Sequence, residues 1–391
     1  MNIRQEIRLP DLGALLGRSG AAAPRRRRSS RRPERVVHRE LVGLKVGASQ
    51  IAAAQVVNDG SPELVRVGRE RLRDGIVVGG EVKNPQALGV ALGDFFARHE
   101  LPTKSVRLGV ANNRIGVRAF QIAGVVDETQ LGNAIRFRAQ ELLPIPLEEA
   151  VLDYHVIGKT TDEAGQVMWR IVLVVAHRDL IDHYVQACDA AGLGLVGIDL
   201  EAFGLLRALA APQDADPSGE TSALVGVSLG HDRSTFAVSD GRVCEFARVL
   251  NWGGEMLTDA IAKAVPLPTL DAETAKRTLT LEDPTAVPDG LTVDQGSRAV
   301  EAVRAELRSF ARELVSSLHF YQNQPASLPL GEIVLTGGTS QLPGLAGELE
   351  RVVGVSVRIA DPLARVQSAP ALAEVDELGS LTVAIGLGIE D

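Results

Sequence analysis

Two short segments of the chain repeat one pattern that can hold phosphate groups. Residues 41–47 read Leu-Val-Gly-Leu-Lys-Val-Gly, and residues 224–230 read Leu-Val-Gly-Val-Ser-Leu-Gly. In both, an aliphatic strand runs into a glycine turn and a second strand follows. Backbone N–H groups at such turns receive phosphate oxygens, so two facing turns predict a nucleotide clamp between two related halves. The pattern also fits two ordinary β-hairpins, whose turn glycines need no ligand.

A third glycine turn is a candidate for another side of the same site. Residues 332–341 read Glu-Ile-Val-Leu-Thr-Gly-Gly-Thr-Ser-Gln. The apolar run predicts a buried strand that ends at Gly337, and Pro343 marks the start of a helix that Gly354 ends. Adjacent glycines allow a flat group such as adenine to approach the backbone closely.

The remaining chemistry-bearing side chains form no recognisable catalytic or metal pattern. The seven histidines lack the spacing of a metal site, and His177 and His183 have no acidic partner at helical distance. We therefore expect no dedicated metal site. Asp199 and Glu201, in the run Ile-Asp-Leu-Glu, fit an acid pair, although roles at a strand end and a helix cap suit them better.

The elements that must position these turns belong to a large, globular chain. Its 391 residues correspond to two to four domains, and 45% hydrophobic residues with 23% charged residues exclude a disordered protein. Two cysteines exclude a disulfide-rich scaffold and a four-cysteine zinc site. No apolar run approaches the length of a membrane span, and no secretory signal begins the chain.

The charge is distributed unevenly along the chain. Residues 1–40 contain 11 Arg and 4 acidic residues, whereas the whole chain has a net charge of −9. Repulsion among the arginines, together with prolines, predicts a disordered tail over residues 1–40. This tail suits an anionic membrane surface, and a merely solubilising extension fits it as well. The acidic remainder disfavours nucleic acid as a partner.

Two further elements can be read from the hydrophobic pattern. Apolar residues at helical spacing predict a long helix over residues 297–321. The stripe consists of Val303, Leu307, Phe310, Leu314 and Leu318. A run rich in Pro, Asp, Ser and Gly predicts a linker between the halves at residues 211–221.

From residue 41 to residue 390 the sequence resembles the PilM family, which comprises actin-like proteins of the type IV pilus inner-membrane platform. It resembles the cell-division protein FtsA less well. Five segments carry the resemblance to PilM. They are residues 72–83 (Leu-Arg-Asp-Gly-Ile-Val-Val-Gly-Gly-Glu-Val-Lys), residues 134–154, residues 253–258 (Gly-Gly-Glu-Met-Leu-Thr), residues 335–345 and residues 360–362 (Ala-Asp-Pro).

The resemblance implies an α/β fold of the two-lobed actin/Hsp70 type, which is a duplicated ribonuclease H-like fold with a small inserted subdomain. The implied parts are the tail at 1–40, the first lobe at 41–105 and 177–212, the inserted partner-binding subdomain at 106–176, the second lobe at 213–262 and 328–391, and a cap subdomain of the second lobe at 263–327.

The resemblance also implies that ATP or ADP binds in the cleft, with turns from both halves at the phosphates and a helix start near the ribose. The aligned residues are Lys45, Gly47, Ala48, Ser49, Gln50, Gly230, His231, Asp232, Gly253, Gly254, Glu255, Gly337, Gly338 and Thr339. Actin-like proteins usually carry Asp in the first two turns, where this chain has Lys45 and Ser228. Such carboxylates hold Mg²⁺ against the phosphates. Because this chain lacks both of them, we expect no meaningful turnover, and a role for Mg²⁺ stays open.

Several roles fit the lysine that replaces the first aspartate. Lys45 is either a product of drift in a non-functional pocket, or an ammonium that replaces the metal and binds phosphate directly. A third alternative is that Lys45 pairs with Asp232 and fills the cleft. Asp232 is also a candidate for a displaced carboxylate ligand of Mg²⁺. We expect nucleotide binding to be weak or independent of metal.

The inserted subdomain is implied to capture the cytoplasmic tail of a PilN-like membrane protein. The matched groove residues are Ile135, Arg136, Phe137, Glu141, Pro144 and Pro146, and packing in a helix core fits each of them equally. The resemblance implies a cytoplasmic scaffold, peripheral to the inner membrane, that serves pilus assembly and cell motility. Other pilus platform and motor proteins are further implied partners.

Two alternatives to a non-catalytic scaffold remain. One is an active actin-like ATPase that switches partner affinity by lobe closure, against which the two missing aspartates speak. The other is an FtsA-like filament former, which concentration-dependent polymer in light scattering or electron microscopy would reveal.

Overall fold

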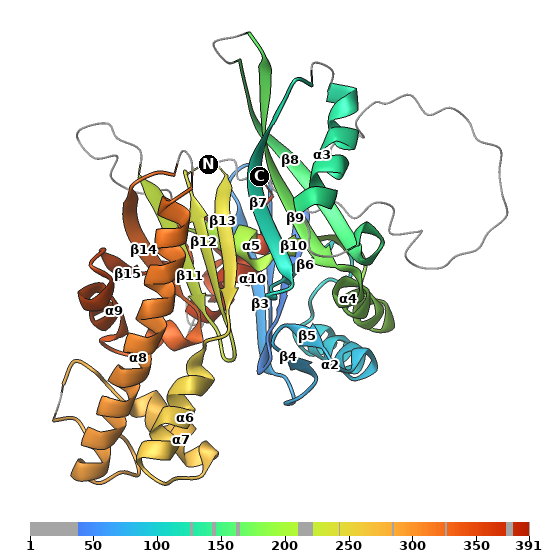
Figure 1. Ribbon diagram of the computed structural model, residues 1–391. Helices are drawn as coiled ribbons and strands as arrows, with labels where there is room; N and C mark the ends of the chain where they lie inside the picture. Colours follow the sequence, from blue (N-terminus) through green and yellow to red (C-terminus); the bar gives the residue numbers. More distant parts are fainter. Residues whose placement is uncertain are drawn as a thin grey trace.

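The computed structural model describes residues 38–125, 128–142, 146–161, 165–209, 222–241, 243–283, 285–324, 327–372 and 378–390. These residues form two lobes, each on its own sheet, with a small three-stranded sheet at one end and a pair of short helices at the other (Figure 1). Nearly all of the expected tail and the whole expected linker lie outside the described residues.

The first lobe is built on a six-stranded mixed sheet. Its elements are β1 (Glu40–Val46), β2 (Gln50–Val57), β3 (Glu63–Arg71), β4 (Val77–Val78), β5 (Glu81–Val82), α2 (Pro85–Arg98), β6 (Val106–Val110), α4 (Arg178–Ala190), β10 (Leu195–Leu200) and α5 (Glu201–Ala208). The strand order is β10-β6-β1-β2-β3-β16, where β16 is Gln367–Ser368. Asn84 caps α2 by accepting a hydrogen bond from the Ala87 N–H, and Pro85 supplies the first helical residue. Helix α2 then packs against α4.

The second lobe repeats this arrangement on a five-stranded sheet. Its elements are β11 (Ala223–Leu229), β12 (Ser234–Ser239), β13 (Cys244–Leu250), α6 (Gly254–Ala264), α7 (Thr269–Thr278), α8 (Val293–Gln322), β14 (Leu330–Thr336), α9 (Leu345–Val353) and β15 (Val357–Ile359). Strand β11 pairs antiparallel with β12 and parallel with β14, as β1 pairs with β2 and β6. This shared topology confirms the two related halves that the glycine turns predicted.

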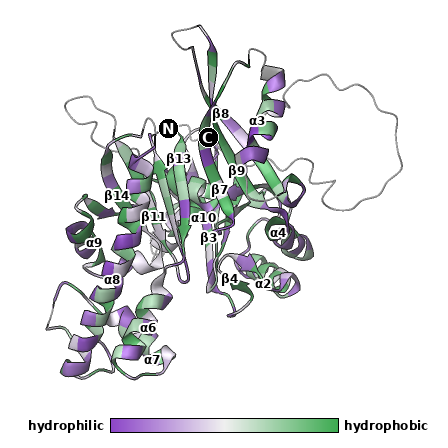
Figure 2. Cartoon of the chain, in the orientation of Figure 1, coloured by the Kyte–Doolittle hydropathy of each residue, from purple (hydrophilic) through white to green (hydrophobic). Residues whose placement is uncertain are grey.

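The predicted long helix is confirmed and is longer than expected. Helix α8 begins at Val293, where Thr292 and Gln295 form a reciprocal capping box, and it ends at Gln322. The whole predicted apolar stripe is buried in the core of the second lobe. Figure 2 shows α8 alternating between hydrophobic and hydrophilic colours, as an amphipathic helix must when one side covers a sheet. Within the described ranges, no helix is both long and apolar enough to span a membrane.

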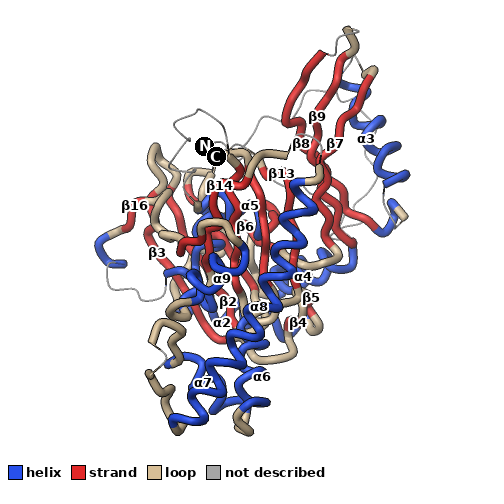
Figure 3. Tube along the Cα trace, turned by 60° about the vertical axis from the view of Figure 1, so that its left-hand side comes forward, coloured by secondary structure: helices blue, strands red, loops and turns tan. Residues whose placement is uncertain are grey.

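The inserted subdomain is a three-stranded antiparallel sheet covered by one helix. Its elements are β7 (Ile115–Ala123), α3 (Glu128–Leu142), β8 (Ala150–Thr161) and β9 (Val167–His177), with β9 in the middle of the sheet. Buried Leu131 and Ile135 of α3 pack against Trp169 and Ile171 of β9. Figures 1 and 3 show this sheet projecting from the end of the molecule opposite α6 and α7.

Two boundaries expected from the sequence are wrong. The insertion was expected to begin at residue 106, but β6 pairs with β1 and β10 in the first-lobe sheet, so the insertion begins after β6. Residues 328–391 were expected to lie wholly in the second lobe. Instead β16 pairs with β3, and α10 (Thr382–Gly388) packs on α5, β1 and β2. Both differences arise from long-range parallel pairing and packing that local sequence does not encode.

The inserted subdomain also contacts the second lobe. Strand β7 packs beside β13 (Figure 1). Arg170 of β9 forms an ion pair with Glu245 of β13, whose other oxygen accepts a hydrogen bond from the Tyr321 hydroxyl at 2.7 Å. Because Glu245 is buried, these partners satisfy a carboxylate that would otherwise be costly to bury. The insertion is therefore joined to both lobes.

Helices α5 and α10 cross between the two sheets at a contact that only glycine allows. A Cβ atom on Gly386 would lie 1.8 Å from the carbonyl oxygen of Gly204. The two backbones therefore touch, and any side chain at Gly386 would push the helices apart.

We expect Gly386→Ala to lower the free energy of unfolding by about 1–3 kcal/mol or more, because the added methyl group overpacks this crossing. Gly347→Ala is the matched control, since Gly347 lies in helix α9 and no described residue outside its own turn of helix comes within 4 Å of the position of a Cβ. The control should be neutral or slightly stabilising. Urea unfolding followed by circular dichroism measures both, and equal midpoints for the two variants would contradict the close crossing.

Candidate functional site

A cavity of about 320 Å³ lies between the two lobes. It is lined by twelve of the fourteen residues predicted for a nucleotide site, which the fold brings together from four separate segments. They are Lys45, Gly47, Ala48, Ser49, Gln50, Gly230, His231, Asp232, Gly254, Gly337, Gly338 and Thr339. Of the other two, Glu255 lines an adjoining hollow of about 640 Å³, and Gly253 lines neither.

The two predicted turns have the same geometry. The Gly47 N–H donates to the Gln50 carbonyl at 2.9 Å, and the Gly230 N–H donates to the Arg233 carbonyl at 3.0 Å. Each glycine thus closes a four-residue turn between two antiparallel strands, β1 with β2 and β11 with β12. Because β1 and β11 head the two related halves, their turns face one cavity from opposite lobes.

The third glycine turn is attached to the second. Gly337 has φ +93°, and a Cβ atom there would lie 2.3 Å from the Leu229 carbonyl oxygen, so this position requires glycine. The Thr339 hydroxyl donates to the Gly230 carbonyl at 3.0 Å. Helix α6 is attached as well, because the N–H groups of Gly254 and Glu255 donate to carbonyls of the β11–β12 turn. The second-lobe side of the cavity is therefore one connected unit.

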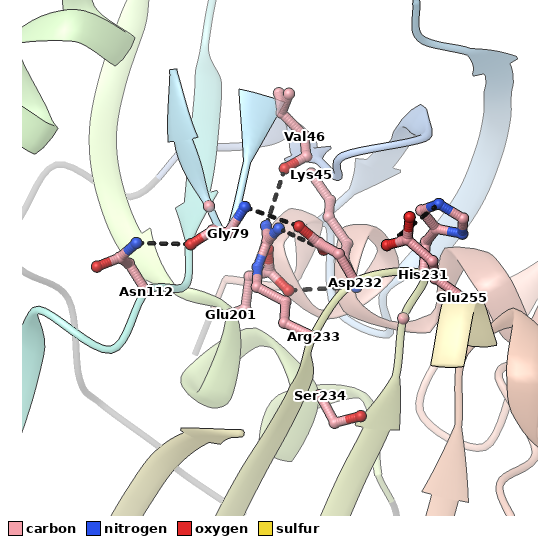
Figure 4. Close-up of polar contacts among 12 residues, drawn as sticks. Lys45, Val46, Gly79, Asn112, Glu201, His231, Asp232, Arg233, Ser234 and Glu255 are labelled. Atoms are coloured by element: carbon pink, nitrogen blue, oxygen red, sulfur yellow. Dashed lines mark hydrogen bonds and ion pairs between the residues drawn. The ribbon is translucent and has the colours of Figure 1, made fainter. Parts of the chain in front are cut away.

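Lys45 of β1 reaches into the cavity and pairs with a carboxylate that the sequence did not predict as its partner. Its Nζ lies 3.2 Å from Glu201 Oε2 (Figure 4). It also donates to Ser228 Oγ at 3.4 Å. The alternative in which Lys45 pairs with Asp232 is wrong. Asp232 is turned instead toward the β4–β5 turn of the first lobe, where it accepts a hydrogen bond from the Gly79 N–H.

Glu201 opens helix α5 and is only 2% exposed. Its second oxygen, Oε1, lies 3.5 Å from Nη2 of Arg233, so its carboxylate sits between two cations from different lobes. Asp199, by contrast, is buried against Arg207 and does not reach the cavity. In the sequence, the run Ile-Asp-Leu-Glu indicates a pair of acids. Only the fold shows that Asp199 is structural and that Glu201 lines the cavity.

Arg233 was not predicted and joins the lobes. Its side chain is buried, and Nη2 donates to the Val46 carbonyl at 3.2 Å while Nη1 donates to Asp232 at 3.1 Å. Burial alone would lower the pKa of Arg233, but the neighbouring Glu201 carboxylate, with Tyr184 and Asp232, raises it, so the guanidinium stays charged.

Asp232 completes a contact across the cavity. It accepts a hydrogen bond of 2.8 Å from the Gly79 N–H, and the Gly79 carbonyl accepts one of 2.6 Å from the Asn112 side chain (Figure 4). Gly79 lies in the turn between β4 and β5 of the first lobe. We call the five residues Lys45, Gly79, Glu201, Asp232 and Arg233 the cross-cleft network.

The helices at the far end of the second lobe contribute a further charged group that sequence reasoning missed. Lys276 of α7 donates to Glu273 at 2.5 Å, to the Thr258 hydroxyl at 2.9 Å and to the Gly254 carbonyl at 3.0 Å. Burial raises the pKa of Glu273, but the hydrogen bonds from Lys276 and Thr258 outweigh it and lower the pKa. Both side chains of this pair line the cavity.

Comparison with known proteins assigns the chain to a family. Residues 43–391 match the family described as type IV pilus assembly protein PilM. The chain belongs to the PilM family. A solved PilM–PilN type IV pilus biogenesis complex contains a chain with the same fold at a TM-score of 0.73 and 24% identity, covering 90% of this chain and 99% of that one.

Two further relatives place the PilM family member among actin-like proteins. The cell division protein FtsA of Escherichia coli (strain K12) is 26% identical over 361 residues, which cover 83% of this chain and 84% of FtsA. The ethanolamine utilization protein EutJ of Carboxydothermus hydrogenoformans matches at a TM-score of 0.50 and 15% identity, covering 90% of this chain and 92% of EutJ. The expected two-lobed actin-like fold is confirmed.

The cavity of this PilM family member suits an anionic ligand better than a metal ion. Its three lining carboxylates, Glu201, Asp232 and Glu273, each pair with a lysine or an arginine. Mg²⁺ needs several oxygen ligands that are not already neutralised, so these residues do not fit it. Among the described residues, no group of three or more His, Cys, Asp or Glu side chains has metal-binding geometry. Two glycine turns, a glycine-rich third turn and buried cations fit phosphate groups.

The residues predicted to bind a partner lie in different environments on helix α3 of this PilM family member. Phe137 is 66% exposed, and Arg136 and Glu141 are also exposed, with Glu141 paired to Arg138. Ile135 is 2% exposed and packs in the core of the inserted subdomain, so it follows the alternative of core packing. Pro146 is exposed, and Pro144 lies outside the described residues.

We expect Arg233→Met to lower the free energy of unfolding by about 3 kcal/mol or more, because it leaves the buried Glu201 carboxylate with Lys45 alone. Arg39→Met is the matched control. Arg39 pairs with Asp59 at 2.5 Å, but both side chains are largely exposed, so its loss should cost less than about 0.5 kcal/mol. Denaturant unfolding measures both, and comparable losses would show that the cross-cleft network does not stabilise the fold.

Proposed function

We propose that this chain is a non-catalytic scaffold of type IV pilus assembly that binds the cytoplasmic tail of a PilN-like membrane protein. The family assignment supports the role in pilus assembly, and the fold shared with the solved PilM–PilN complex supports the partner. The observation that supports a scaffold rather than an enzyme is the cross-cleft network. It joins both lobes through the protein's own charges, which supports a lobe arrangement that needs neither a bound metal nor a hydrolysed ligand.

The inserted subdomain is the proposed partner-binding part. Phe137, Arg136 and Glu141 present an aromatic ring and both charges on the outer face of α3. Strand β8 is an edge strand in the described part of the subdomain, with backbone groups on one side available to an added strand. An extended peptide tail commonly combines strand addition with apolar anchors, and an exposed aromatic side chain suits such an anchor.

The cleft is proposed to bind ADP or ATP without Mg²⁺. Lys45 and Arg233 place two positive charges between the glycine turns, where a metal would otherwise neutralise the phosphates. Phosphoryl transfer to water depends on such a metal and on an oriented water molecule. We therefore propose that the chain binds nucleotide as a structural ligand and does not hydrolyse it.

The proposed location is the cytoplasmic face of the inner membrane, where the tail of a PilN-like protein would be found. The 11 arginines of residues 1–40 suit an additional contact with anionic lipid at roughly 1 kcal/mol for each basic residue near the surface. Other pilus platform and motor proteins are further proposed partners.

Nucleotide binding is tested by the melting temperature of protein shown to be free of nucleotide. We expect ADP or ATP to raise the melting temperature by the same amount with Mg²⁺ and with EDTA. The rise should be measurable, because a ligand at 100 times its dissociation constant stabilises the folded state by about 2.7 kcal/mol. A rise that needs Mg²⁺ would contradict metal-independent binding and favour the ATPase switch. No rise with either nucleotide would refute the nucleotide cleft.

Partner binding is tested with a fluorescent peptide copied from the cytoplasmic tail of the PilN-like protein encoded with this chain. We expect Phe137→Ala to weaken binding about tenfold or more, because exposed aromatic anchors carry much of the energy of such contacts. Val90→Ala is the matched control, since Val90 of α2 is 68% exposed outside the inserted subdomain. Fluorescence anisotropy measures all three proteins, and failure of the unaltered chain to bind would refute the proposed partner.

A further inference from the structure

A carboxylate of the protein itself occupies the space between the two glycine turns. Glu201 is 2% exposed, lines the cavity and comes from α5 rather than from either turn. One of its oxygens lies 3.2 Å from Lys45 Nζ of the first lobe, and the other lies 3.5 Å from Arg233 Nη2 of the second. Figure 4 shows the carboxylate between these two side chains. It therefore makes the contacts with cations that a ligand's phosphate group would need.

Glu201 is the only carboxylate paired with Lys45 among the described residues, whereas Arg233 is also paired with Asp232 at 3.1 Å. The other contact of Lys45 is the neutral Ser228 hydroxyl. Arg233 also contacts Asp232, but its Nε atom is buried and has no hydrogen-bond partner among the described residues. Asp232 in turn is held by the Gly79 N–H at the edge of the network. Without the Glu201 charge, the two cations would keep only the Asp232 carboxylate, so the centre of the cavity would carry a net positive charge that attracts an anion.

We propose that Glu201 is a built-in competitor of the anionic ligand and sets how tightly the cleft binds a nucleoside diphosphate. This inference rests on the proposed nucleotide cleft. A phosphate that enters between the turns finds Lys45 and Arg233 already paired with the buried carboxylate of Glu201. It must displace that carboxylate from Lys45 and Arg233 or share them with it, and either outcome lowers affinity.

The same arrangement gives a metal carried by the ligand no binding site of its own. Both oxygens of Glu201 are already paired with cations, so this side chain offers no free carboxylate to a magnesium ion carried by the phosphates. The charge order of the cleft, with one carboxylate between two cations, is the reverse of a metal site, in which one cation lies between carboxylates.

The test is the affinity for ADP in EDTA, measured by isothermal titration calorimetry on the full chain. Glu201→Gln keeps the size of the side chain, removes its charge and leaves an acceptor oxygen for only one of the two cations, and we expect it to bind ADP about tenfold more tightly or better. Adenosine, which has no phosphate, should bind both proteins alike. Glu245→Gln is the matched control, because Glu245 is another buried carboxylate that joins parts of the fold but does not line the cavity.

The outcomes separate this inference from the nucleotide cleft itself. If the unaltered chain binds ADP and Glu201→Gln binds it equally or more weakly, the competitor role is overturned and the cleft stands. An equal gain with Glu245→Gln would assign the effect to looser lobes and also overturn it. No ADP binding by either protein refutes the cleft and this inference together. If Glu201→Gln does not fold, Glu201→Asp draws the carboxylate back from the cations and should also bind ADP more tightly, and unchanged affinity would overturn the proposal.

Discussion

The fold depends on one buried carboxylate that cannot stand alone. Glu201 is almost completely removed from water, and burying an unpaired charge costs several kcal/mol. Its two cations belong to different lobes: Lys45 pairs with it within the first lobe, and Arg233 reaches it from the second. Closure of the two lobes therefore adds the second cation to this buried charge. Asp232, which pairs with Arg233 and accepts from the Gly79 N–H, extends the same constraint to a second turn of the first lobe.

Two other contacts support the same arrangement of the lobes. Helix α10 returns to the first lobe and crosses α5 at backbone distance, which places Glu201 at the beginning of a helix that cannot shift freely. At the far end, Glu245 of the second lobe pairs with Arg170 of the inserted subdomain. The proposed partner surface on α3 is thus attached to both lobes rather than to one. The proposed scaffold would benefit from such rigidity, whereas a hinged ATPase would need these contacts to open.

Local sequence was sufficient to predict the repeated glycine turns and the helix whose apolar residues recur at helical spacing. The paired glycine turns, the Gly337 turn and the apolar stripe of α8 all follow from short-range patterns, and the structure places each where it was expected. The partners of Lys45 were beyond local sequence, because Glu201 and Arg233 lie more than 150 positions away along the chain. The same reason explains the two misplaced boundaries. Strand β6 belongs to the first lobe because it pairs with β1, and β16 belongs there because it pairs with β3. A short strand carries no local signal of its distant partner, so the sequence alone could not assign these segments to a lobe.

The most direct test of this account is amide hydrogen exchange at Gly79 in the ligand-free protein. Its N–H donates to Asp232 across the cleft, so exchange at this amide reports whether the lobes are held together by the cross-cleft network alone. The account predicts slow exchange without nucleotide, unchanged by Mg²⁺ and accelerated by Arg233→Met. Exchange as fast as in an unstructured peptide, slowed only when ATP and Mg²⁺ are added, would show that a bound nucleotide closes the cleft and would contradict the central role of Glu201.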